Sequence, residues 1–133
     1  MADYSKEMSN KLNIKLRKQI EYLPSFANTF FRGISANTSI KTRIAYAMDL
    51  KIFFEYLIEN HPKFTHYKDI KDICLSDLDY IKAVDLEDFS EYLSYYTKGH
   101  YKNDETKVSL SNSNRGKMRK LSTLRSFYKY YFK

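Results

Sequence analysis

The sequence predicts an all-α protein. Its 133 residues include only three glycines and two prolines, so the chain has little of the material that tight β-hairpin turns require. Apolar residues recur instead at intervals of three and four, which is the spacing of one face of an α-helix. With 43% hydrophobic and 29% charged residues, a chain of this length is typical of one globular domain with a substantial core.

Two helices are predicted in the first part of the chain. The first covers about residues 10–22, where leucine and isoleucine recur along one apolar stripe. Pro24 ends this helix, because proline lacks the backbone N–H that a helix interior needs. Residues 26–34 form a short second helix that closes at Gly33.

The strongest helical pattern lies at residues 38–59. Ser39 is the predicted N-cap, because a serine hydroxyl can accept a hydrogen bond from a free backbone N–H of the first turn. An apolar stripe extends from Ile40 to Ile58, so we expect this helix to be largely buried. The helix closes before Pro62.

The second half of the chain is predicted to contain two more helices. Residues 61–84 are irregular apart from a short turn, and a helix follows at residues 84–98. The polar loop 102–108 has no periodic pattern and is predicted to be disordered. The last helix covers residues 113–132. Its predicted apolar stripe consists of Met118, Leu121, Leu124, Tyr128, Tyr131 and Phe132.

The last 23 residues carry the whole formal net charge of +7. Residues 111–133 contain seven Lys or Arg and no acidic residue, whereas residues 1–110 contain both signs in equal number. Asp69 to Glu91 is the acidic part of the chain, and we expect it to face away from a polyanion. A basic helix on a neutral body is typical of nucleic-acid-binding proteins. Its predicted basic face consists of Arg115, Arg119, Ser122, Ser126, Lys129 and Lys133.

A second basic cluster lies in the first turn of the predicted helix 38–59. Lys41 and Arg43 stand where the free backbone N–H groups and the positive end of the helix dipole also favour an anion. Basic side chains there are unfavourable for the helix itself, which indicates a phosphate partner. We therefore predict that this helix start and the start of the last helix lie side by side on DNA. The alternatives are a solvated basic face and a suboptimal helix start.

Three segments form a pattern of motifs across residues 36–132. They are Ser39-x-x-Thr42-x-x-x-Tyr46-x-x-Asp49-Leu50, residues 85–93 and residues 119–130. Together they resemble the core-binding domain of tyrosine recombinases, the phage-integrase and Xer-type enzymes, and residues 119–130 are the most specific part. The resemblance implies an all-α, SAM-like bundle of four to five helices that docks on one face of duplex DNA. A catalytic domain on the opposite face completes a clamp in that family.

The resemblance also implies a division of the chain and a set of DNA-binding residues. Residues 1–35 are expected to be an N-terminal arm or additional helices, and residues 36–133 the core-binding domain. The predicted DNA contacts are Ser39, Lys41, Thr42, Arg43, Arg115, Gly116, Lys117, Arg119 and Lys120.

The predicted function is to hold duplex DNA at a recombination site, with other recombinase protomers as further partners. Recombinase chemistry needs a tyrosine nucleophile beside Arg, Lys and His side chains, and in this family those lie in a C-terminal catalytic domain. We expect that domain to be absent from this chain, so the chain alone is not expected to be an enzyme. A stand-alone helical DNA-binding regulator and a SAM-like protein-interaction module remain alternatives.

The sequence predicts no metal site, cofactor, membrane partner or small-molecule substrate. His61, His66, His100 and Cys74 match no zinc-binding spacing. Cys74 is interpreted as a buried structural thiol, since no partner motif for a reactive cysteine accompanies it. A single cysteine, together with the absence of a signal peptide or a spanning apolar run, favours a cytoplasmic protein.

Overall fold

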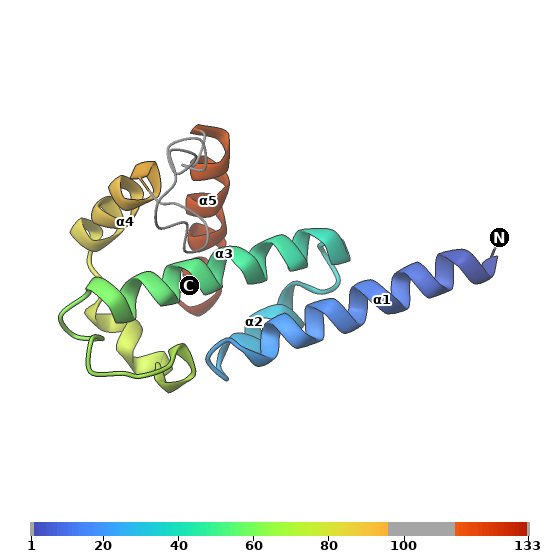
Figure 1. The fold of residues 1–133 in the computed structure, drawn as a ribbon, viewed down its shortest axis with the longest axis horizontal. Helices are drawn as coiled ribbons and strands as arrows, with labels where there is room; N and C mark the ends of the chain where they lie inside the picture. Colours follow the sequence, from blue (N-terminus) through green and yellow to red (C-terminus); the bar gives the residue numbers. More distant parts are fainter. Residues whose placement is uncertain (1, 96–113, 133) are drawn as a thin grey trace, which may run out of the picture.

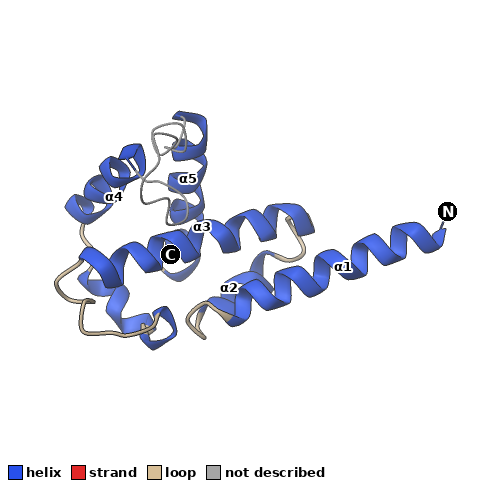
Figure 2. Ribbon diagram, viewed as in Figure 1, coloured by secondary structure: helices blue, strands red, loops and turns tan. Residues whose placement is uncertain are grey.

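The computed structural model describes residues 2–95 and 114–132 and is all helical across them. The prediction of an all-α fold is confirmed, since these two ranges contain no strand (Figure 2). The predicted loop 102–108 lies outside the described residues. The elements follow in the order α1 (Ala2–Glu21), α2 (Ala27–Ile34), α3 (Ile40–Asn60), η1 (Ile70–Asp72), η2 (Leu75–Tyr80), α4 (Ala83–Tyr95) and α5 (Asn114–Tyr131), where η marks a short 3₁₀-helix.

Helix α3 is the central element, and both α1 and α5 pack against it (Figure 1). Its start is the predicted one: Ser39 has extended backbone dihedral angles, and its hydroxyl accepts a hydrogen bond from the backbone N–H of Thr42 at 3.1 Å. Its end is fixed by the backbone N–H of His61, which donates to the carbonyl oxygen of Leu57 at 2.9 Å. The terminal turns of α3 therefore follow from local capping, while its length follows from the apolar stripe.

One hydrophobic core joins the helices, and Phe127 of α5 lies within it. Its ring centroid is 5.1 Å from that of Phe30 in α2 and 6.0 Å from that of Phe54 in α3. Both contacts are edge-to-face, the arrangement that aromatic quadrupoles favour. The largest fully buried aromatic side chains of the core are Phe30, Phe53, Phe54, Phe64, Phe89 and Phe127.

Helix α1 is longer than predicted, because it already begins at Ala2. Leu16 and Leu23, at its second half and just beyond its end, are buried in the common core. The side chains of residues 5–11 are all exposed, and Figure 1 shows the first half of α1 extending away from the other helices. The additional turns contain no glycine or proline, so nothing local stops the helix. No helix in the described parts of the chain has the length and apolar character needed to cross a membrane.

Acidic side chains cap the two 3₁₀-helices that connect α3 to α4. Asp69 accepts a hydrogen bond from the backbone N–H of Lys71 at 2.9 Å. Asp77 accepts one from the backbone N–H of Cys74 at 2.9 Å and another from the hydroxyl of Tyr67 at 2.6 Å. Several acidic residues of this region therefore satisfy backbone donors, and the segment is more regular than predicted.

The prediction that Cys74 is a buried thiol is wrong, because its side chain is exposed. Cys74 occupies the N-cap position of η2, and the residue before it, Ile73, is 3% exposed and takes the inward position. Successive side chains of an extended segment point to opposite sides, so the residue after Ile73 points outward.

The buried face of α5 also differs from the predicted apolar stripe. Met118 and Phe132, which were assigned to that stripe, are 69% and 51% exposed. The inward positions are held instead by Lys120, Thr123 and Phe127, together with Leu124. Because Lys120 and Thr123 are polar but buried, the spacing of apolar residues in the sequence does not indicate which side of α5 faces the core.

Candidate nucleic-acid interface

The outer face of α5 carries a stripe of basic residues. Arg115, Ser122 and Lys129 are exposed and separated by steps of seven positions, which is close to two helical turns. Arg125 is also exposed, and α5 contains no acidic residue. Between Arg115 and Lys129 the helix rises by about 21 Å. We call Arg115, Ser122, Arg125 and Lys129 the basic stripe.

Arg119 lies at the edge of the basic stripe and makes an ion pair with the protein itself. Its Nη2 is 2.7 Å from Oδ1 of Asp49 in α3. The hydroxyl of Thr123 donates a hydrogen bond to the other carboxylate oxygen at 2.8 Å. The side chain of Asp49 is fully buried, while that of Arg119 is 52% exposed. Arg119 therefore compensates a buried charge and joins α5 to α3, with about half of its side chain still accessible.

Three of the predicted DNA contacts on α5 lie outside the exposed basic stripe. The Nζ of Lys117 donates a hydrogen bond to the hydroxyl of Ser94 in α4 at 2.8 Å. Lys120 is only 7% exposed. Gly116 is partly buried. These three residues are not part of the exposed basic stripe.

The predicted contacts on α3 are split between two sides of the helix. Lys41 is exposed, whereas Arg43 donates long hydrogen bonds of 3.5 Å to the Thr38 carbonyl and 3.4 Å to the Ser39 carbonyl. Two positions correspond to about 200° around a helix, so these two basic side chains leave α3 in nearly opposite directions. The hydroxyl of Ser39 is occupied by the cap, since it also donates to the Thr42 hydroxyl at 2.9 Å.

The starts of α3 and α5 do not lie side by side. Helix α5 meets α3 at Asp49, which is nine positions after Ile40 and therefore about 14 Å along the axis. Figure 1 shows the first turns of the two helices in separate places. The structure thus gives one continuous basic stripe on α5, with Lys41 as a more distant basic residue.

The described residues offer no metal centre as an alternative site. In the ranges 2–95 and 114–132, no three His, Cys, Asp or Glu side chains come together in a way that could hold a metal ion. His61 instead makes a structural contact, with its Nε2 3.2 Å from a carboxylate oxygen of Asp85 at the start of α4.

The chain has sequence similarity to a protein of known class. It is 34% identical over 113 residues to Tyrosine recombinase XerC of Caldanaerobacter subterraneus subsp. tengcongensis. The match covers 84% of this chain and 29% of that protein, so the chain spans less than a third of the relative's length. No family model matches the chain, and no solved structure matches it.

Proposed function

We propose that the chain is the core-binding domain of a tyrosine recombinase and binds duplex DNA for site-specific recombination, because it is similar to part of such a recombinase. Its role is to hold the duplex at the recombination site, beside other recombinase protomers. Strand exchange is assigned to a separate catalytic domain that these 133 residues do not contain. The similarity to only part of the recombinase supports this division.

The basic stripe of α5 is the observation that carries the proposal. Arg115, Arg125 and Lys129 are exposed on one helix without an acidic neighbour on that helix. Ser122, between them, has a short side chain that leaves room for a phosphate backbone to approach. The charges of residues 1–110 cancel formally, so attraction of a polyanion is concentrated on this helix.

The test is the salt dependence of binding to a fluorescently labelled duplex, measured by anisotropy. If about four to six phosphates are contacted, the logarithm of the association constant should fall with the logarithm of salt concentration with a slope of about −4 to −5. The preference for particular DNA sequences should be modest, because the catalytic domain that completes the clamp around DNA does not take part. A binding constant that does not respond to salt would contradict the proposal and favour a protein-interaction module.

The assignment of chemistry to another domain has its own test. The chain is incubated with a duplex that traps covalent tyrosyl–DNA intermediates, and the products are separated on a denaturing gel. We expect no covalent adduct. An adduct would place the tyrosine nucleophile within these 133 residues and overturn this part of the proposal.

A further inference from the structure

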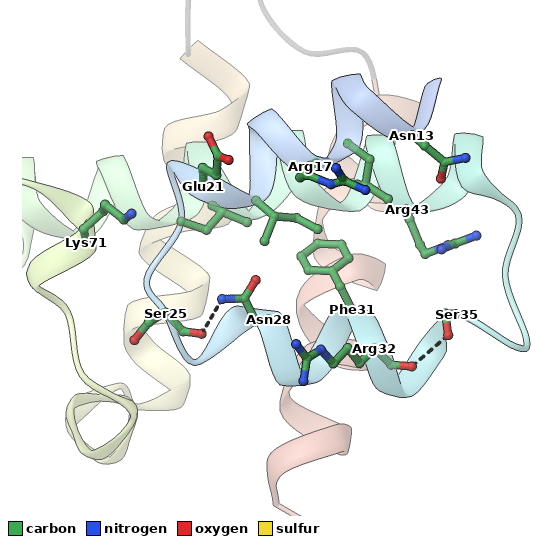
Figure 3. A pocket seen from close by; sticks show the side chains of 13 residues that line it. Asn13, Arg17, Glu21, Ser25, Asn28, Phe31, Arg32, Ser35, Arg43 and Lys71 are labelled. Carbon is green, nitrogen blue, oxygen red and sulfur yellow. Dashed lines mark hydrogen bonds between the residues drawn. The ribbon is translucent and has the colours of Figure 1, made fainter. Parts of the chain in front are cut away.

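A pocket between α1, α2 and the start of α3 collects every arginine that lies outside α5. Arg17 of α1, Arg32 of α2 and Arg43 of α3 line the same cavity of about 540 Å³. Figure 3 shows the three side chains around Phe31, while Lys71 lies at the far end of the pocket. No residue of α5 lines it. The pocket is therefore separate from the basic stripe.

The positive charge of this pocket is poorly compensated by the protein. Within the described parts of the chain, the guanidinium groups of Arg17 and Arg32 have no ion pair or hydrogen bond, and Arg43 contacts only two carbonyl oxygens. The lining holds a single acidic residue, Glu21, against four basic ones. Like charges brought together from three helices repel one another, so an anion bound among them would be favourable.

The floor of the pocket is part of the hydrophobic core. Leu16, Leu23 and Phe31 line it and are 6%, 1% and 4% exposed. The side chains of Arg17 and Arg32 are exposed, so they can turn toward an anion that rests on this floor. Because the side chains of the floor are fixed by core packing, the three helices that carry the arginines are held in place around the cavity. Its volume falls in the usual range for small-molecule pockets.

We propose that this pocket binds a phosphate group, as an anion site separate from α5. Guanidinium groups bind phosphate oxygens bidentately, and several of them together match a group that carries up to two negative charges. The phosphate belongs either to a nucleic-acid backbone or to a small phosphorylated molecule, and the apolar floor suits an organic body attached to it. The site does not depend on the proposed role of α5, since no residue of α5 lines the pocket.

The first experiment follows the arginine Nε–Hε signals by NMR while inorganic phosphate is added. Sodium chloride at the same ionic strength is the reference. We expect saturable shifts of the Arg17, Arg32 and Arg43 signals with phosphate only. In the double variant Arg17→Gln/Arg32→Gln, the phosphate-induced shift of the Arg43 signal should disappear. The matched control Arg125→Gln, on α5, should leave that shift intact. Both pocket substitutions are at exposed side chains, and a thermal melt confirms that the variant is folded.

Equal shifts with phosphate and chloride would overturn the proposal, as would phosphate-induced shifts that persist in the double variant. A short polyglutamate peptide is added in a parallel titration. If it shifts the three signals and phosphate does not, the pocket is a protein-binding site and the phosphate assignment is wrong.

A second experiment identifies the source of the phosphate with a DNA duplex. If the duplex displaces inorganic phosphate, and the double variant reduces the magnitude of the salt slope by about one to two, the ligand is a nucleic-acid backbone. If the duplex shifts Arg125 but leaves the pocket signals unchanged, the ligand is a small phosphorylated molecule. Either result supports a phosphate site. If α5 does not bind DNA, the Arg125 signal will stay unchanged when the duplex is added, and this result is distinct from the behaviour of the pocket signals.

Discussion

Arg119 and Asp49 join the two helices that cross at the centre of the molecule. The ion pair has a length of 2.7 Å, and its acidic partner is fully buried while its basic partner is 52% exposed. Thr123 satisfies the second carboxylate oxygen. The same arginine thus stabilises the core and lies at the edge of the proposed DNA surface, so its two roles must be measured separately.

Arg119→Ala should destabilise the fold, because it leaves the charge of Asp49 buried without its cationic partner. We expect the free energy of unfolding to fall by about 2–4 kcal/mol, measured by urea denaturation. Arg125→Ala is the matched control on the same helix, and its exposed side chain should matter by less than about 0.5 kcal/mol. Equal losses in the two variants would show that the ion pair has no special role in stability.

Substitutions in the basic stripe should weaken DNA binding without unfolding the protein. Arg115→Ala and Arg125→Ala should each reduce the magnitude of the salt slope by about one if they contact phosphates. If Arg115 reads a base edge, its loss should cost about 1–3 kcal/mol and relax sequence preference. Lys82→Ala, at an exposed position in the acidic region, is the control and should leave the anisotropy titration unchanged. A comparable effect of Lys82→Ala would contradict the proposed surface.

Two neighbouring tyrosines should respond in opposite ways to the loss of a hydroxyl. The hydroxyl of Tyr128 is buried without a hydrogen-bond partner in the described part of the chain, and burial raises its pKa. The hydroxyl of Tyr131 donates to the carbonyl oxygen of Phe26. Tyr128→Phe should therefore be neutral or stabilising, and Tyr131→Phe should cost about 0.5–1.5 kcal/mol. Thermal melts of both variants decide this, and the reverse order would refute it.

The Tyr67–Asp77 hydrogen bond should make part of the stability sensitive to alkaline pH. This hydrogen bond, with a smaller contribution from burial, raises the pKa of Tyr67 to about 12. The neutral phenol is thus favoured in the folded state, so its contribution is complete below the ordinary pKa of about 10 and is lost as the pH rises to about 12. Tyr67→Phe should be less stable than the parent at pH 8, and the difference should shrink between pH 10 and 12. A difference that is constant across that window would contradict this origin.

The positions of α3 and of the end of α1 could be predicted from the sequence, because they depend on local signals. The Ser39 cap, the Pro24 break and the apolar stripe of α3 each lie within a few residues of the boundaries they set. The orientation of α5 about its own axis could not be predicted from apolar spacing alone. Lys120 and Thr123 take inward positions, and Phe127, three positions after Leu124, is buried although the predicted stripe does not contain it.

The candidate site was harder to predict, because it depends on contacts between distant segments. Asp49 stands between apolar residues of α3, but nothing in the sequence pairs it with Arg119, which lies 70 positions later. The placement of Arg17, Arg32 and Arg43 around one pocket had no such signal, since the three residues lie on different helices and share no motif. Lys41 and Arg43 were grouped by their proximity in sequence, although helical geometry separates them.

The exposed first half of α1 implies a gradient of local stability along that helix. Residues 5–11 gain little from packing, and a short helical segment without tertiary contacts is only marginally stable in water. Amide hydrogens there should exchange with solvent within the dead time of a manual experiment. Those near Leu16 should exchange only through larger openings of the core. A partner that binds the first half of α1 would therefore reveal itself as new amide protection in a segment that is otherwise unprotected.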